Sequence, residues 1–265
     1  TKVMTDLELA LELADLADLI SLDRYLASDL VVESKPDLTP VSDADKAVEN
    51  EIRLQLAKVA ADDGIIGEEF ESSSSTNNRE WILDPIDGTK NFIRGVPVWA
   101  TLIALRVNGV ITVGVVSSPA LGRRWYASAA AGAFVIETVG GSKKVRRLAV
   151  SKVSKVSDAS FAHSEIVKKD IWEGDYDNFL KLSNDVWRTR GFGDFWSYML
   201  VAEGAVDFAI EPKLALWDMA ALDIVVREAG GRFTNTAGID GSLGGSGLST
   251  NSAIHQKIVD KLNGH

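Results

Sequence analysis

The beginning of the chain carries two stretches in which apolar residues recur every three or four positions, the period of an amphipathic helix. These stretches predict helices over 5–28 and 43–60, the first with an acidic, solvated stripe along one side. Pro36 and Pro40 exclude a helix between them, because proline lacks the backbone donor and restricts the residue before it. The chain is therefore expected to start as helix, loop, helix.

Short apolar runs bounded by turn residues predict that strands follow. The first two, at 65–67 and 81–83, end next to acidic residues, and a polar loop at 71–78 separates them. Four further strands are predicted at 100–107, 110–117, 123–129 and 132–137. The dipeptide Asn108-Gly109 favours a two-residue hairpin turn, so this region is expected to form an antiparallel sheet.

The rest of the chain alternates predicted helices with predicted strands. The helices are expected at 172–182, 195–203, 218–229 and 252–262, and the strands at 186–189, 206–210 and 247–249. This alternation favours a partly parallel sheet with helices packed on it. We therefore expect an α/β (α+β) protein with an antiparallel-sheet half, 1–148, and a mixed α/β half, 149–265.

A basic stretch at 143–155 lies at the junction of the two expected halves. It holds six basic residues and no acidic one. We interpret it as a solvated surface connection. The alternative role of these side chains is to attract an anionic substrate.

The amino-acid composition limits the kinds of binding and catalytic site that the protein can contain. The 265 residues are 46% apolar and 25% charged, as in an ordinary globular protein, and the net charge of −10 gives no general attraction for nucleic acid or anionic lipid. There is no cysteine, which excludes disulfides and thiolate sites, and with three histidines any metal site must be built from oxygen. No apolar run is long enough for a membrane span, the start does not resemble a secretory signal, and we expect a cytoplasmic protein.

The segment WILDPIDGTKNF, residues 81–92, is the most informative part of the sequence. An apolar strand is followed by Asp84 and Asp87, with a proline between them, and Gly88-Thr89 then opens a short helix. The free N–H groups at a helix start bind anions such as phosphate. A phosphate beside two carboxylates requires a cation between them, and hard oxygen ligands favour Mg²⁺.

Other acidic residues have simpler local explanations when each is taken alone. Glu68, after the strand at 65–67, is typical of surface charge. Asp218 is placed to cap the helix at 218–229, and Asp45 to stabilise the start of the helix at 43–60. Capping and metal binding are compatible if one carboxylate oxygen serves each purpose.

The joint occurrence of these segments resembles a known family. WILDPIDGTKNF and WDMAALDIVVREAGG are similar to the two signature segments of the inositol monophosphatase superfamily of Mg²⁺-dependent, Li⁺-sensitive phosphatases. The resemblance extends over about 7–262 and includes PVSDAD and IIGEE. It implies a layered αβαβα sandwich and a homodimer. Leu222-Asp223 departs from the small residues common in the second signature, which we expect to alter packing rather than chemistry.

The resemblance also implies residue roles. The metal ligands are expected to be Glu68, Asp84, the carbonyl of Ile86, Asp87 and Asp218. Asp45 and Thr89, with Glu68, are the expected catalytic residues, and Asp87, Gly88 and Thr89 the expected phosphate-binding residues. Two to three Mg²⁺ ions are implied, with Mn²⁺ as a substitute and Li⁺ and Ca²⁺ as inhibitors. The implied reaction is in-line attack of metal-activated water on a phosphate monoester, without a covalent intermediate.

Three further stretches are closer to one branch of this superfamily. KPDLTPVSDADKAVE, GVPVWATLIAL followed by GVVSSPALGRRW, and GDFWSYMLVAEGAVDFAIEP resemble bacterial histidinol-phosphate phosphatases of the inositol monophosphatase type. That branch implies L-histidinol phosphate as substrate and a place in histidine biosynthesis.

Candidate substrate-binding residues follow from this comparison. Asp194 and Glu211 would suit the cationic amine and the imidazole of histidinol phosphate, although Asp194 also fits as the N-cap of the helix after it. Arg190 and Asp223 are further candidates, and His163 is a residue whose role the sequence leaves open.

Three alternative functions stay open at this point. They are an inositol-1-phosphatase or broad sugar-phosphate phosphatase, a nucleotide 3′-phosphatase, and a regulatory binding protein on a phosphatase scaffold. An acidic pocket wall should repel the second phosphate of the nucleotide. A regulatory protein predicts a lost ligand or catalytic residue, and every matched position is intact.

Overall fold

The computed structural model describes residues 3–166, 172 and 176–265. Its N-terminal part is built on a seven-stranded sheet with the strand order β3-β4-β5-β6-β7-β8-β9. The strands are β3 (Gly64–Gly67), β4 (Arg79–Asp87), β5 (Ala100–Val107), β6 (Val110–Ser118), β7 (Arg123–Ser128), β8 (Gly132–Val139) and β9 (Ser142–Arg147). β3 and β4 are parallel and the other neighbours antiparallel, with β5 and β6 joined at Asn108-Gly109 as predicted.

The C-terminal part contains a five-stranded sheet with the order β11-β10-β12-β14-β13. Its strands are β10 (Ser160–His163), β11 (Arg188–Arg190), β12 (Phe208–Glu211), β13 (Arg232–Thr234) and β14 (Gly247–Thr250). β10 runs parallel to β11 and β12, whereas β14 is antiparallel to β12 and β13. The predicted partly parallel sheet is therefore confirmed.

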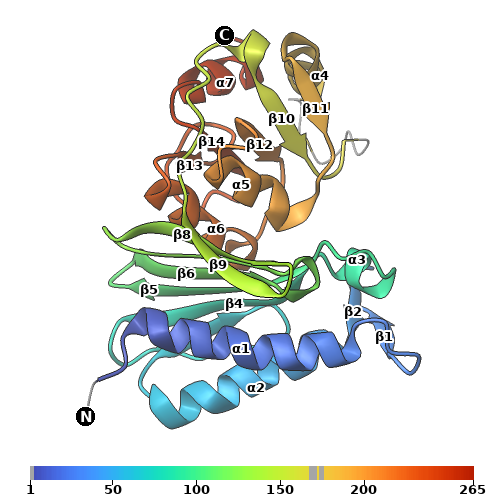
Figure 1. Cartoon of the computed structure of the whole chain (residues 1–265), viewed down its shortest axis with the longest axis vertical. Helices are drawn as coiled ribbons and strands as arrows, with labels where there is room; N and C mark the ends of the chain where they lie inside the picture. Colours follow the sequence, from blue (N-terminus) through green and yellow to red (C-terminus); the bar gives the residue numbers. More distant parts are fainter. Residues whose placement is uncertain (1–2, 167–171, 173–175) are drawn as a thin grey trace.

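Helices and sheets alternate in five layers (Figure 1). α1 (Asp6–Arg24) and α2 (Asp43–Val59) cover one face of the first sheet, and α5 (Asp194–Ala202) and α6 (Leu216–Glu228) lie between the two sheets. α4 (Tyr176–Asp185) and α7 (His255–Leu262) cover the outer face of the second sheet. The predicted αβαβα sandwich is confirmed.

α6 belongs by sequence to the second half but packs against the first sheet. Gly114 on β6 permits this approach, because a Cβ there would lie 2.5 Å from Ile224 Cγ2 and 2.8 Å from the Ala221 carbonyl oxygen. The interface between the parts is thus a shared core rather than a hinge. The division at residue 148 stays a prediction.

Several predicted boundaries need correction. The first helix ends at Arg24 instead of residue 28, because Tyr25 leaves the helix with extended backbone and packs against Phe92 and Trp99. β4 runs to Asp87, so both aspartates lie within the strand, at a bulge that shifts its register with β5. The predicted helix at 172–182 is present over Tyr176–Asp185; 173–175 lie outside the described residues.

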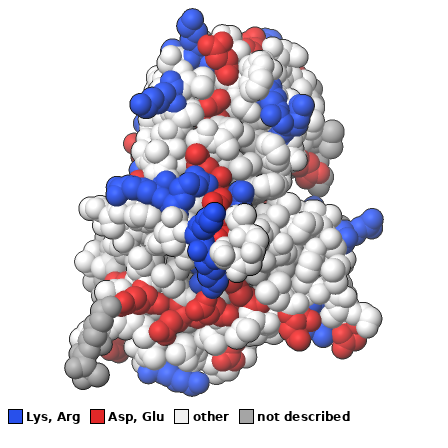
Figure 2. Space-filling view, in the orientation of Figure 1, with Lys and Arg blue, Asp and Glu red and all other residues white. Residues whose placement is uncertain are grey.

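Among the described residues, five short strands are not predicted from the sequence. They are β1 (Val32–Ser34), β2 (Pro40–Ser42), β9, β10 and β13. β9 takes up the first part of the basic stretch at 143–155 and forms the edge of the first sheet, with every residue exposed. Lys and Arg side chains cross the middle of the face in Figure 2, where Figure 1 shows β9. Exposed cations on an edge strand discourage pairing with another sheet.

No helix within the described ranges is both long enough and apolar enough to cross a membrane.

Candidate active site

Two parallel strands bring the first acidic residues together. β3 and β4 pair with Gly67 opposite Leu83, and the N–H of Glu68 donates to the Leu83 carbonyl over 3.2 Å. Because parallel strands end at the same edge, Glu68 follows β3 next to Asp84 on β4. Asp87 closes the same strand after the bulge.

The third aspartate of the cluster comes from the other part of the chain. Carboxylate oxygens of Asp84, Asp87 and Asp218 all lie within 4.8 Å of one another. Asp218 is the third residue of α6, where its Oδ2 accepts the N–H of Ala215 over 2.8 Å. Asp218 is therefore not the N-cap, which is Ala215, but it stabilises the helix start from the third helical position, and its side chain also joins the acidic cluster.

The cluster is electrostatically strained without a cation. Asp84 is buried, and its Oδ1 has no hydrogen-bond partner among the described residues. Burial, reinforced by the charges of Glu68, Asp87 and Asp218, raises the pKa of Asp84 well above its usual range. Burial likewise raises the pKa of Asp218 to about 6. A partnerless buried oxygen among hard oxygen donors fits a divalent ion such as Mg²⁺.

Glu68 has a partner that the sequence reasoning did not single out. Lys35, on the turn between β1 and β2, donates to Glu68 over 2.8 Å and to Glu69 over 2.7 Å. Partial burial lowers the pKa of Lys35, but the two carboxylate hydrogen bonds outweigh this and raise it above normal. The ammonium group of Lys35 thus forms an ion pair with Glu68. Glu68 is not part of the group formed by Asp84, Asp87 and Asp218.

Asp45 and Thr89 are in direct contact. Thr89 Oγ1 lies 2.9 Å from Asp45 Oδ1 and 3.0 Å from the carbonyl oxygen of Ile86. The other oxygen of Asp45 accepts the N–H of Ser42 over 2.8 Å, which forms a capping box at the start of α2. Burial raises the pKa of Asp45, although hydrogen bonds from Ser42 and Thr89 oppose the rise.

Gly88 precedes α3 (Thr89–Ile93) with a φ of 84°, a conformation that favours glycine. A Cβ at this position would lie 2.8 Å from the carbonyl oxygen of Val98 and 3.1 Å from Asp194 Oδ2. The position therefore requires glycine, because a side chain there would collide with Val98 and crowd Asp194.

The two predicted specificity residues are linked through Ser164, which no sequence signal marks. Ser164 Oγ donates to Glu211 Oε1 over 2.7 Å and accepts the N–H of Asp194 over 2.8 Å. Burial raises the pKa of Glu211 to about 8, with the charge of Asp194 adding to the effect. Burial also raises the pKa of Asp194 to about 6, while Lys90 opposes the rise.

Asp194 is not the N-cap considered from the sequence. Gly193 occupies that position, and α5 begins at Asp194. The carboxylate of Asp194 instead accepts Asn91 Nδ2 over 3.1 Å. The side chain is thus directed toward α3 and the acidic cluster.

Two further candidates have partners outside the acidic cluster. Arg190 is exposed on the edge strand β11, where it donates to the Thr189 carbonyl over 2.7 Å. Asp223 pairs with Arg227 over 2.6 Å. It lies five residues after Asp218, about 140° further around α6, and therefore faces elsewhere. His163 is half-buried beside Phe161, with ring centroids 5.6 Å apart, and its role stays open.

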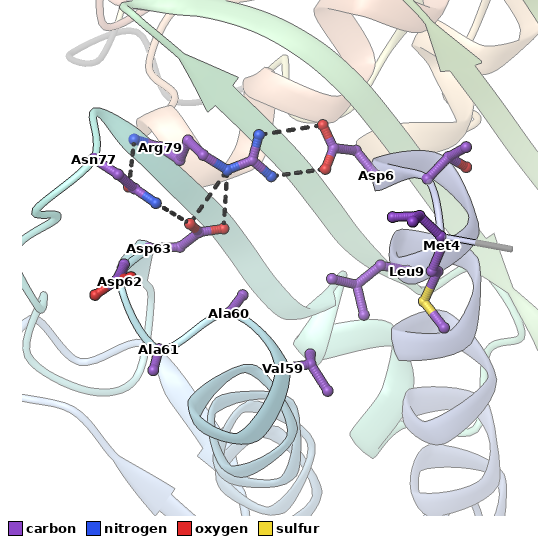
Figure 3. Close-up of a pocket in the computed structure, with 12 residues that line it drawn as sticks. Met4, Asp6, Leu9, Val59, Ala60, Ala61, Asp62, Asp63, Asn77 and Arg79 are labelled. Carbon is purple, nitrogen blue, oxygen red and sulfur yellow. Dashed lines mark hydrogen bonds and ion pairs between the residues drawn. The ribbon is translucent and has the colours of Figure 1, made fainter. Parts of the chain in front are cut away.

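A cavity of about 560 Å³ lies away from these residues, between the start of α1 and the end of α2 (Figure 3). On its polar wall, Arg79 pairs with Asp6 over 2.7 Å and with Asp63 over 3.2 Å. None of the predicted site residues lines it. The cavity therefore adds nothing to the candidate active site.

Comparison with known proteins agrees with this geometry. Residues 5–265 match the family model described as the inositol monophosphatase family. The chain belongs to this family. A histidinol-phosphatase of Mycobacterium tuberculosis is 52% identical over 97% of the chain and 98% of the relative. A histidinol-phosphatase of Streptomyces coelicolor is 51% identical over 98% of the chain and 97% of the relative. The crystal structure of the Bartonella henselae suhB protein, 29% identical, superposes with a TM-score of 0.85 over 96% of each chain.

Proposed function

We propose that this protein is a Mg²⁺-dependent phosphatase that hydrolyses L-histidinol phosphate to L-histidinol and phosphate. The observation that carries the proposal is the pairing of two acidic sets: the cluster of Asp84, Asp87 and Asp218, and the neighbouring carboxylates Asp194 and Glu211. Identity above 50% to two histidinol-phosphatases over nearly the whole chain supports the choice of substrate.

The first acidic set would hold the metal. The proposed ligands of two Mg²⁺ ions are Glu68, Asp84, the carbonyl of Ile86, Asp87 and Asp218, with a third ion near Glu68. The unpaired Oδ1 of Asp84 supports this assignment. When bound, Mg²⁺ would lower the pKa of a water molecule and neutralise phosphoryl charge. Mn²⁺ is the proposed substitute, and Li⁺ and Ca²⁺ the proposed inhibitors.

Asp45 and Thr89 would orient water and take its proton. The single hydroxyl proton of Thr89 can be donated to Asp45 over 2.9 Å, which leaves its oxygen free to accept from water. The raised pKa of Asp45 brings its basicity closer to that needed for proton transfer near neutral pH. The backbone N–H groups of Gly88 and Thr89 would hold the phosphate, assisted by Asp87.

The second acidic set would recognise the leaving group. Asp194 and Glu211 have raised pKa values because burial disfavours their charged forms, although Lys90 opposes the rise at Asp194. The ammonium group of histidinol phosphate would supply the missing positive charge and hydrogen bonds to both carboxylates. A neutral polyol such as inositol would supply hydroxyl donors but no charge.

The deciding experiment compares phosphate release from histidinol phosphate, inositol 1-phosphate, glycerol 2-phosphate and adenosine 3′,5′-bisphosphate. We expect the highest kcat/KM for histidinol phosphate. A higher kcat/KM for inositol 1-phosphate would make the protein an inositol-1-phosphatase, and similar values across the panel would make it a broad phosphatase.

Homodimer assembly and a cytoplasmic location are further parts of the proposal. The homodimer is carried by family resemblance, and the cytoplasmic location remains the expectation from the sequence; light scattering and cell fractionation test them.

A further inference from the structure

Glu49 is a buried carboxylate on α2 to which the mechanism above gives no role. It lies four residues after Asp45 and therefore on the same face of the helix. Its side chain is 0% exposed. Ionised carboxylates are rarely buried unless a cation and hydrogen-bond donors compensate them. The donors around Glu49 therefore indicate what it does.

One cation and two backbone N–H groups meet at Glu49. Arg53 donates to Glu49 Oε1 from Nε over 2.9 Å and from Nη2 over 2.8 Å. The N–H of Glu69 donates to Oε2 over 2.8 Å, and the N–H of Phe70 to Oε1 over 3.3 Å. Both backbone donors belong to the segment that follows Glu68. Glu49 thus fixes the chain immediately after a proposed metal ligand.

Gly67 makes room for this arrangement from the other side of Glu68. A Cβ on Gly67 would lie 2.0 Å from Glu49 Oε1 and 2.5 Å from its Cδ. The N–H of Glu68 itself donates to the Leu83 carbonyl over 3.2 Å, next to Asp84. The backbone of Glu68 is therefore held between β4 on one side and the carboxylate of Glu49 on the other.

We propose that Glu49, neutralised by Arg53, is a positioning residue that holds Glu68 beside Asp84 for metal binding. The proposal rests on the proposed function, because it takes Glu68 as a ligand of Mg²⁺. Glu49 must be ionised, because only a carboxylate offers two oxygens that act purely as hydrogen-bond acceptors. A glutamine would keep one acceptor and turn an NH₂ group toward Arg53 or the backbone donors.

The test is calorimetric titration of the full-length, metal-free protein with Mg²⁺ alone, without substrate. Glu49→Gln is expected to weaken Mg²⁺ binding roughly 10- to 100-fold, the usual effect of removing a group that orients a ligand. Gly67→Ala is expected to weaken it in the same direction, because its Cβ displaces the carboxylate of Glu49.

Asp207 supplies the matched control. It is also a buried carboxylate that fixes a backbone segment, since its Oδ2 accepts the N–H of Ser160 over 2.6 Å, but it lies at the start of β12. We expect Asp207→Asn to lower the thermal unfolding temperature and to leave Mg²⁺ affinity unchanged.

The outcomes separate the two proposals. The role of Glu49 is supported if the parent protein binds Mg²⁺, if Glu49→Gln and Gly67→Ala bind it more weakly, and if Asp207→Asn binds it as the parent does. Parent-like Mg²⁺ affinity in folded Glu49→Gln overturns it, and so does equal weakening in Asp207→Asn. If Glu49→Gln does not fold, Gly67→Ala decides by the same criterion. A parent protein that binds no Mg²⁺ overturns the proposed function itself.

Discussion

The backbone N–H of Phe195 donates to Asp87 Oδ2 over 2.8 Å. This bond links the start of α5, in the C-terminal part, to the end of β4, which carries two of the aspartates in the cluster. Asp194, a proposed specificity residue, is the neighbour of Phe195 in the chain. The carboxylates proposed for metal binding and those proposed for substrate recognition are therefore held at a fixed separation.

Asp84→Asn should abolish phosphate release while the fold persists. Asparagine keeps the size of the side chain but removes the charge that the proposed metal requires. The metal-free variant should be at least as stable as the parent, because burial already raises the pKa of Asp84 well above its usual range. Steady-state kinetics and circular dichroism measure the two effects. Substantial turnover by the folded variant would contradict the role of Asp84.

Asp194→Ala and Glu211→Ala should each lower kcat/KM for histidinol phosphate by about 10- to 100-fold, since a hydrogen bond to a charged group contributes about 1.5–3 kcal/mol. Glycerol 2-phosphate lacks the amine, so its kcat/KM should fall much less. Asp223→Asn is a suitable control, because Asp223 pairs with Arg227 outside the site. Equal losses on both substrates would make the two residues structural instead of specificity-determining.

Gly88→Ala should reduce activity more than stability. The new Cβ would lie 2.8 Å from the Val98 carbonyl oxygen, and the φ of 84° costs alanine roughly 1–2 kcal/mol relative to glycine. Displacement of the Gly88-Thr89 backbone should raise the inhibition constant of inorganic phosphate. Gly109→Ala, at a φ of 82° in a hairpin with open space around it, controls for backbone strain alone. A similar loss of phosphate affinity in both variants would contradict the proposed phosphate contact.

The metal-free protein should lose stability as the pH rises. Burial raises the pKa of Glu211 to about 8, above that of glutamate in an unfolded chain, about 4.3. The folded state therefore holds the proton of Glu211 more tightly than the unfolded state does, and this stabilises the fold. The contribution to the free energy of unfolding is fully present at low pH and is lost as the pH rises through about 8. Thermal unfolding at pH 7 and pH 9 measures the effect, and Glu211→Gln should reduce the difference. An unchanged difference in that variant would show that other groups cause it.

Some residues of the candidate site can be predicted from the sequence, and others cannot. Asp84, Asp87 and Gly88 were accessible because the strand, the acids and the helix start are contiguous in the chain. Asp218 was accessible through its own signature segment. Lys35, Ser164 and Glu49 were not singled out, because their roles depend on partners that are distant in sequence, such as Glu68, Glu211 and Glu69.

The errors in the predicted fold have similar causes. The sequence pattern predicts the first helix past Arg24 because nothing local marks its end; Tyr25 leaves the helix to pack against aromatic residues more than sixty positions later. The strands β10 and β13 have few residues and depend on pairing with β12 and β14. Arg190, a further candidate for substrate binding, is exposed on the edge strand β11, and its role stays a prediction.

The most direct test of the account is the anomalous diffraction of Mn²⁺ in soaked crystals of the parent protein. We predict a Mn²⁺ peak enclosed by the carboxylates of Asp84, Asp87 and Asp218. Fully ordered side chains at these positions with no anomalous peak between them, at a Mn²⁺ concentration that supports phosphate release, would contradict it.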